Sequence, residues 1–142
     1  MATHELDFSK LTVLVVDDQE YIRKLVCQLI RRLGCESILE ASDGSEALKL
    51  LARLTPDMVL CDIKMQPVNG LEFLRKVRGA EDGVRDPQVP IVFLTSDSDR
   101  GTVVAAMKSD VDGYLVKPVS PADLKTKIVA VLSKRTATRV TW

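Results

Sequence analysis

Two hydrophobic patterns alternate along the 142-residue chain. Short runs rich in Val, Ile and Leu have the length of strands, and several are apolar at every position. Uniform hydrophobicity indicates burial on both faces, as in a parallel sheet that helices cover on both sides. The predicted strands are residues 11–16, 37–40, 58–62, 91–95 and 113–117.

Helical periodicity fills the segments between these strands. The clearest case follows the first strand, where apolar residues recur at spacings of three and four and stop before Gly34. Further helices are predicted at residues 45–54 and 70–78. A fifth helix begins near Ser120, which can cap it, with Pro121 at the first helical position and Asp123 completing a capping-box-like pair.

A fourth predicted helix, at residues 100–108, differs from the others in its apolar face. Only Val103, Val104 and Met107 contribute to that face, so the stripe is thin. We therefore expect this helix to be loosely held and able to shift.

Five strands that alternate with helices over short connections predict an α/β fold with (βα)5 topology. Right-handed crossovers then give a doubly wound, parallel five-stranded sheet. We expect one domain at residues 10–133, an N-terminal extension at residues 1–9 and a frayed, basic C-terminal tail at residues 134–142. A chain of this length fits one hydrophobic core, and no internal repeat is visible.

Composition narrows the classes of partner. Twenty Lys and Arg balance twenty Asp and Glu, and this argues against non-specific nucleic-acid binding, which depends on neutralising phosphates. We expect protein partners instead. Neither a signal peptide nor an apolar run of membrane-spanning length is present, so we expect a cytoplasmic protein without membrane insertion. The three cysteines lack metal-site or disulfide spacing and are expected to be reduced and buried.

Charged residues stand at the ends of three apolar strands. Asp17 and Asp18 follow the first strand, Asp62 closes the third and Lys117 closes the fifth. The carboxyl ends of parallel strands share one edge of a sheet, so these residues predict an acidic pocket with a lysine beside it. Carboxylates a few Å apart repel each other by about 4 kcal/mol per pair at an effective dielectric constant of 20, and therefore need a cation. Oxygen ligands with room for water suit Mg²⁺.

Four motifs on alternating strands resemble the receiver domain of two-component response regulators, in its stand-alone chemotaxis-type form. They are Val-Val-Asp17-Asp18, Cys-Asp62-Ile-Lys-Met65 leading to Gly70, Leu-Thr95-Ser96 and Tyr114-Leu-Val-Lys117-Pro118. The resemblance covers about residues 10–133. It implies a flavodoxin-like sheet with strand order 2-1-3-4-5.

The resemblance also implies a ligand set and a phosphoacceptor. Asp62 accepts a phosphoryl group from a histidine kinase or a histidine phosphotransfer protein. Asp18 and Asp62 are direct Mg²⁺ ligands, Asp17 acts largely through water, and the backbone carbonyl of Lys64 supplies another oxygen. The expected product is an aspartyl phosphate, formed by a side-chain nucleophile as in other acyl phosphates.

Catalytic and switch residues follow from the same resemblance. Thr95 and Lys117 stabilise the phosphoryl oxygens, Tyr114 swings inward when Thr95 moves, and Lys117-Pro118 is a cis bond. The readout face is helix 4, strand 5 and helix 5. No output domain is seen after residue 133, so a downstream protein is expected to supply the output. The chain would thus be a switch that catalyses only its own phosphorylation and dephosphorylation.

The chain departs from the family pattern near the site. Gln66-Pro67 shifts the usual proline by one position, and Asn69 stands where aspartate is common. Lys64 and Asp97 lie two residues beyond Asp62 and Thr95, at positions that tune the lifetime of the phosphorylated state in the family. As a hypothesis, their opposite charges pair over the pocket and hinder the attacking water.

Other interpretations remain open. Asp18 alone is as consistent with helix capping as with metal binding. A phosphohydrolase that forms an aspartyl phosphate with Mg²⁺ needs a second aspartate where this chain has Lys64. A flavodoxin-like ligand-binding or structural module would need a phosphate-binding loop after the first strand, where Asp17 and Asp18 repel phosphate. A pseudo-receiver, which interacts without phosphorylation, is the nearest alternative, and the intact acidic residues argue against it.

Overall fold

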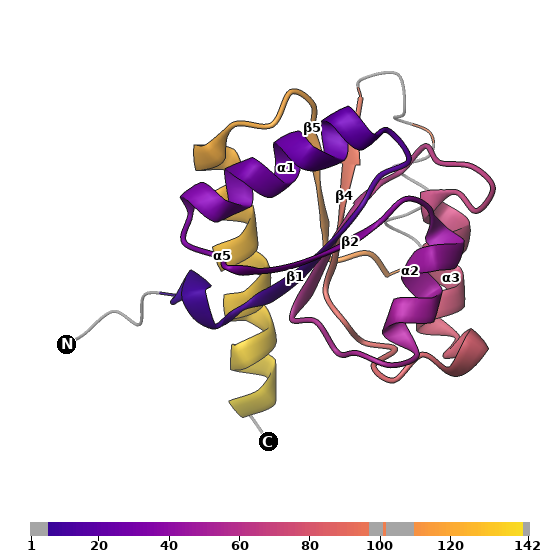
Figure 1. Ribbon diagram of the computed structural model, residues 1–142. Coiled ribbons are helices and arrows are strands. Elements are labelled where there is room, and N and C mark those ends of the chain that lie inside the picture. The colour runs from indigo at the N-terminus through magenta and orange to yellow at the C-terminus, as the bar shows by residue number, and fades with distance from the viewer. Residues whose placement is uncertain (1–5, 97–100, 102–109, 141–142) are drawn as a thin grey trace.

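The computed structural model describes residues 6–96, 101 and 110–140, of which residues 135–140 are described by their backbone. One parallel sheet runs through the molecule in the order β2-β1-β3-β4-β5, which confirms the predicted fold class and strand order. Figure 1 shows the sheet between two layers of helices. The strands are β1 (Thr12–Val16), β2 (Ser37–Ala41), β3 (Met58–Asp62), β4 (Ile91–Thr95) and β5 (Gly113–Val116).

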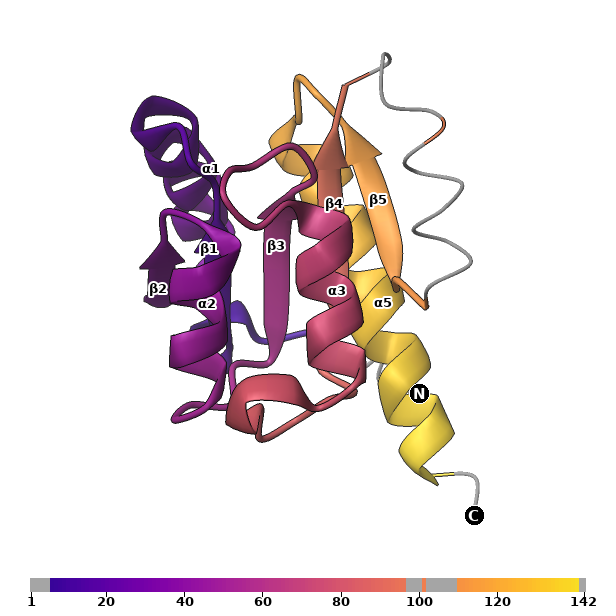
Figure 2. The ribbon, with the colours of Figure 1, turned by 90° about the vertical axis from the view of Figure 1, so that its right-hand side faces the viewer.

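Helices cover both faces of the sheet. They are α1 (Glu20–Arg32), α2 (Gly44–Leu51), α3 (Gly70–Arg78) and α5 (Pro121–Val140), with 3₁₀ turns η1 (Phe8–Lys10) and η2 (Glu81–Gly83). The α2 and α3 helices lie on one face and α1 and α5 on the other (Figure 2). The predicted helix at residues 100–108 falls outside the described residues except for Gly101. None of the helices in the described part of the chain is long and apolar enough to cross a membrane.

Two apolar clusters sandwich the sheet, because successive strand residues point to opposite faces. On the α1 and α5 side, Val15, Leu60 and Leu94 pack with Ile30 and Ile128. The opposite cluster, under α2 and α3, is formed by Val16, Cys61, Phe93, Leu48 and Phe73, among others. Every residue of β3 and β4 is buried, including Asp62 and Thr95 at their carboxyl ends, and the apolar run before each of these polar residues predicts the burial.

The two ends of the domain depart from the sequence prediction. The predicted frayed tail is wrong for the backbone of residues 134–140, because α5 continues to Val140. No Pro or Gly interrupts that segment, so nothing local ends the helix earlier. At the other end, Phe8 belongs to the predicted extension but is buried in the core beside Gly34. The α2 helix ends at Leu51, three residues before the predicted end.

Gly70 sets the distance between the start of α3 and the end of β3. Its amide donates to the carbonyl oxygen of Ile63 at 2.9 Å. A Cβ at this position would lie 2.8 Å from Ile63 Cα and 3.0 Å from the Asp62 carbonyl oxygen. Asn69 caps the helix by accepting from the Glu72 amide at 2.8 Å. The fixed spacing from Asp62 to Gly70 therefore holds the β3–α3 loop against the end of the sheet.

Candidate functional site

Three carboxylates meet at the carboxyl edge of the sheet. One oxygen from each of Asp17, Asp18 and Asp62 lies within 4.8 Å of the others. The β1 and β3 strands are neighbours with Val16 paired to Cys61, so the residues that follow each pair face one crevice. Asp17 and Asp62 are 1% and 7% exposed, whereas Asp18 is exposed. The structure thus brings together the acidic residues that the sequence placed at separate strand ends.

Lys117 reaches the same cluster from β5. Its ammonium nitrogen lies 3.2 Å from Asp62 Oδ1 and 3.8 Å from Asp17 Oδ2. Its backbone amide donates to the Thr95 carbonyl oxygen at 2.7 Å, which holds the start of the β5–α5 loop against β4. The Lys117-Pro118 bond is cis, as the resemblance implied, and Gln66-Pro67 is also cis. The lysine neutralises part of the acidic charge but leaves the cluster net negative.

The electrostatics of Asp17 and Asp62 favour an additional cation. Burial is the main cause that raises the pKa of Asp17, and the neighbouring Asp62 and Asp18 raise it further. The hydrogen bond from the Gln19 amide and the charge of Lys117 lower it, but by less. Burial likewise raises the pKa of Asp62, while Lys117 acts in the opposite direction. Asp17 Oδ1 accepts from the Gln19 amide at 2.9 Å, but its buried Oδ2 accepts no hydrogen bond from the described residues. An all-oxygen donor set with an unsatisfied carboxylate oxygen fits a hard divalent cation such as Mg²⁺.

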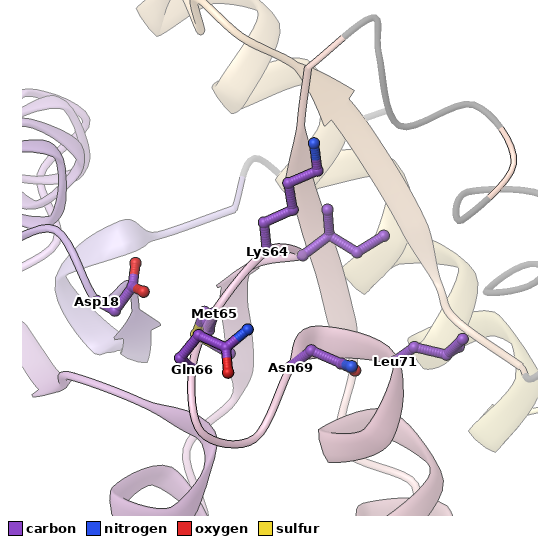
Figure 3. Close-up of a pocket in the computed structure, with 7 residues that line it drawn as sticks. Asp18, Lys64, Met65, Gln66, Asn69 and Leu71 are labelled. Atoms are coloured by element: carbon purple, nitrogen blue, oxygen red, sulfur yellow. The ribbon is translucent and has the colours of Figure 1, made fainter.

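A pocket of about 470 Å³ opens beside the carboxylates. Figure 3 shows Asp18 on one side of it and the β3–α3 loop on the other, with the Lys64 side chain pointing away from Asp18. The Lys64 amide lies 3.4 Å from Asp62 Oδ1, so this loop contacts the carboxylate through its backbone. The lining residues are Asp18, Ile63, Lys64, Met65, Gln66, Asn69 and Leu71.

Thr95 and Tyr114 lie on adjacent strands. Thr95 is buried at the end of β4, and its hydroxyl donates to the Ser96 carbonyl oxygen at 3.2 Å. In the parallel register Phe93 pairs with Tyr114 and Thr95 pairs with Val116, so Thr95 and Tyr114 point to the same face of the sheet. Tyr114 is 39% exposed. Asp97 lies outside the described residues.

One contact of the site was not anticipated from the sequence. Arg23, in the first part of α1, donates from Nη1 to the Asp17 carbonyl oxygen at 2.9 Å. Its Nε lies 2.9 Å from Glu40 Oε1 on β2. Nothing in the local pattern of either segment marks this pair, because it links a helix to a strand seventeen residues away. Only the β2-β1 pairing brings Glu40 beside the loop that carries Asp17.

A doubly wound sheet with an acidic cluster and a lysine at its carboxyl edge defines a receiver-type domain. The family model described as response regulator receiver domain matches residues 13–129, and the chain belongs to that family. Its members act in phosphorylation-based two-component signalling, as switches rather than as classical enzymes.

Named relatives and solved structures agree with this family. The chain is 37% identical over 123 residues to the chemotaxis protein CheY1 of Helicobacter pylori. The alignment covers 86% of this chain and 97% of that protein. It is 39% identical over 123 residues to a CheY homologue of Campylobacter jejuni, and the alignment covers 86% of this chain and 92% of that homologue. A receiver domain from Clostridium thermocellum superposes with a TM-score of 0.80 at 27% identity, covering 90% of this chain and 98% of that one.

Proposed function

We propose that this chain is a Mg²⁺-dependent phosphoacceptor switch in which Asp62 receives a phosphoryl group from a histidine kinase or a histidine phosphotransfer protein. The observation that carries the proposal is the meeting of three carboxylates with the Lys117 ammonium, which lies 3.2 Å from Asp62 Oδ1. Such a cluster combines a nucleophile, a cation site and a fixed positive charge. These are the elements that phosphoryl transfer needs.

Mg²⁺ would be held by Asp18 and Asp62 directly, by Asp17 largely through water and by the backbone carbonyl of Lys64. When bound, it neutralises the carboxylates and polarises the oxygens of the incoming phosphoryl group. The buried Oδ2 of Asp17 supports this ligand set, because it accepts no hydrogen bond from the described part of the chain. The 470 Å³ pocket beside Asp18 leaves space for water and for the phosphodonor.

Asp62 acts as the nucleophile in this proposal. One of its carboxylate oxygens forms a bond to phosphorus while the bond from phosphorus to the donor nitrogen breaks, and the electron pair of that bond stays on the donor imidazole. The Lys117 ammonium and the Thr95 hydroxyl each stabilise charge on a phosphoryl oxygen. Attack by water on phosphorus later returns Asp62 to its carboxylate and releases inorganic phosphate.

The switch connects Asp62 to an outer face of the domain. The phosphoryl group attracts Thr95 and Lys117, and Tyr114 moves inward into the space that Thr95 leaves, which biases an existing equilibrium. Thr95 and Tyr114 share one face of adjacent strands, as this coupling requires. Exposed Tyr114 and Val116 supply part of a readout surface together with α5, and a downstream protein in the cytoplasm binds there. The predicted helix at residues 100–108, which the resemblance adds to this surface, lies outside the described residues except for Gly101.

Incubation with acetyl phosphate and Mg²⁺, followed by intact mass measurement, tests the proposal. We expect the native chain to gain one phosphoryl group and Asp62→Asn to gain none. The matched control is Asp57→Asn, which changes a carboxylate just before the opposite end of β3 and should label as the native chain does. Labelling that persists in Asp62→Asn would refute the phosphoacceptor assignment. No labelling of the native chain would favour a pseudo-receiver, and steady phosphate release from small phosphate esters would favour a phosphohydrolase.

A further inference from the structure

Arg23 ties the acidic loop after β1 to the edge strand β2. Its Nη1 donates to the Asp17 carbonyl oxygen at 2.9 Å, and its Nε lies 2.9 Å from Glu40 Oε1. The Arg23 side chain is 13% exposed and the Glu40 side chain 27%, so both contacts are partly shielded from water. Two hydrogen bonds of 2.9 Å, from Lys24 Nζ and from Arg23 Nε, hold the Glu40 carboxylate in place, and they lower its pKa.

The Arg23 contact completes the restraint on Asp17. The Asp17 amide donates to the Ala41 carbonyl oxygen at 3.2 Å, and Asp17 Oδ1 accepts from the Gln19 amide at 2.9 Å. With Arg23 on its carbonyl, Asp17 is held at the amide, the carbonyl and one carboxylate oxygen. Its remaining oxygen, Oδ2, is left facing Asp62 and Lys117.

We propose that Arg23 is a positioning residue for the divalent cation. It fixes the peptide between Asp17 and Asp18, and so sets the spacing of their carboxylates from Asp62. A planar guanidinium suits this task because it can donate in two directions from one rigid group. The inference rests on the proposed function, since it takes Mg²⁺ to bind among these carboxylates.

The charge of Arg23 makes the inference sharply testable. A nearby positive charge repels Mg²⁺, so the loss of charge alone would tighten Mg²⁺ binding. The loss of a positioning contact would weaken it. A purely electrostatic role and a positioning role of Arg23 therefore predict changes of opposite sign in the affinity for Mg²⁺ when Arg23 is replaced by a neutral residue.

Lys24 provides the matched control. Its ammonium pairs with the same carboxylate, 2.9 Å from Glu40 Oε2, and among the described residues it donates to Glu40 and not to Asp17. The Lys24 side chain is 53% exposed. Lys24→Gln removes one positive charge and one Glu40 contact without touching the acidic loop.

The experiment is calorimetric titration of the full chain with Mg²⁺. We expect Arg23→Gln to raise the Mg²⁺ dissociation constant about tenfold, and Lys24→Gln to leave it within about twofold or lower it. Arg23→Lys keeps the charge but lacks the planar guanidinium that donates in two fixed directions. It should therefore recover less than about half of the Mg²⁺-binding free energy that Arg23→Gln loses. Unchanged or tighter binding in Arg23→Gln, or full recovery in Arg23→Lys, would overturn the inference.

Two further measurements separate this role from folding and from the proposed function. Thermal unfolding in EDTA shows whether Arg23→Gln is folded. Should this variant fail to fold, Mg²⁺ titrations of Arg23→Lys and Glu40→Gln take its place. Native affinity for Mg²⁺ in both of these variants overturns the inference. With acetyl phosphate, the positioning role predicts that Arg23→Gln needs more Mg²⁺ for half-maximal labelling but nearly regains the native rate at saturating Mg²⁺. A native chain that binds no Mg²⁺ overturns the proposed function itself, whereas native binding with an unaffected Arg23→Gln overturns only the role of Arg23.

Discussion

Lys117 Nζ lies 3.2 Å from Asp62 Oδ1, although their strands are separated in the sheet by β4. The register pairs Asp62 with Leu94, and pairs Thr95 with Val116, the residue before Lys117. Lys117 therefore lies one step beyond the paired residues, and its long side chain crosses the end of β4 to reach Asp62. This crossing gives Asp62 a fixed positive neighbour at the place where transferred charge accumulates.

Replacement of Lys117 should slow phosphorylation. Lys117→Met removes the charge at nearly constant side-chain length, and we expect the initial rate of labelling by acetyl phosphate to fall by about tenfold or more. The rate is measured by intact mass over time at saturating Mg²⁺. Lys10→Met, at the opposite end of β1, is the control for loss of one lysine. An unaltered rate in Lys117→Met would remove Lys117 from the transfer step.

Asp17 should make stability depend on pH in a definite direction. Burial raises its folded-state pKa above the ordinary value of 3.8. Between 3.8 and the raised value the folded state binds more protons than the unfolded state, so stability falls as pH rises through that window. In EDTA we expect Asp17→Asn to raise the free energy of unfolding at neutral pH and to lose this advantage below the ordinary pKa.

Urea denaturation at several pH values measures this effect, with Asp57→Asn as the control for a change from carboxylate to amide. Saturating Mg²⁺ should reverse the order at neutral pH, since ligand binding stabilises a native chain by about 2.7 kcal/mol at one hundred times the dissociation constant. Asp17→Asn that is less stable than the native chain in EDTA would contradict the account of this residue.

Gly70 should be intolerant of a side chain. In Gly70→Ala the new methyl group would lie 2.8 Å from Ile63 Cα and 3.0 Å from the Asp62 carbonyl oxygen, both of them backbone atoms that cannot rotate away. We expect a loss of about 1–3 kcal/mol in the free energy of unfolding and slower labelling of Asp62, because α3 must move from the end of β3. Gly101→Ala, where the new Cβ meets nothing within 4 Å, is the matched control. Equal stability of the two variants would show that the close approach at Gly70 is unimportant.

Lys64 and Asp97 should set the lifetime of the phosphorylated state. If their opposite charges pair over the pocket and hinder the attacking water, alanine at both positions should accelerate the decay of phosphorylated Asp62. The decay is followed by release of inorganic phosphate after removal of excess acetyl phosphate. Lys76→Ala, on α3 outside the pocket, controls for the loss of a lysine. A decay rate equal to that of the native chain would exclude the pairing.

The convergence of the acidic cluster was predictable because it follows from one rule. Parallel strands end at one edge of the sheet, so Asp17, Asp62 and Lys117 had to share that edge once their strands were recognised. Gly70 could be matched to the family motif from its spacing to Asp62. Its physical reason, the close backbone approach to Ile63, needs the structure.

Other features depend on contacts that leave no periodic signal. The Arg23–Glu40 ion pair joins α1 to β2, and the two residues meet because β2 pairs with β1 in the sheet. In the sequence alone, both look like ordinary solvent-facing polar residues. Phe8 lies in a short polar stretch, and its burial in the core beside Gly34 shows only in the structure. The basic composition of the segment after Lys134 favours a frayed tail, whereas its backbone continues α5, because the segment contains no helix breaker.

The most direct test of the central claim locates the phosphoryl group to a residue. The native chain is incubated with acetyl phosphate in Mg²⁺ and, separately, in EDTA, and the label is mapped by peptide mass spectrometry. We predict one labelled side chain, Asp62, in the Mg²⁺ sample and none in the EDTA sample. A label on another residue, or equal labelling of Asp62 without a divalent cation, would contradict the account.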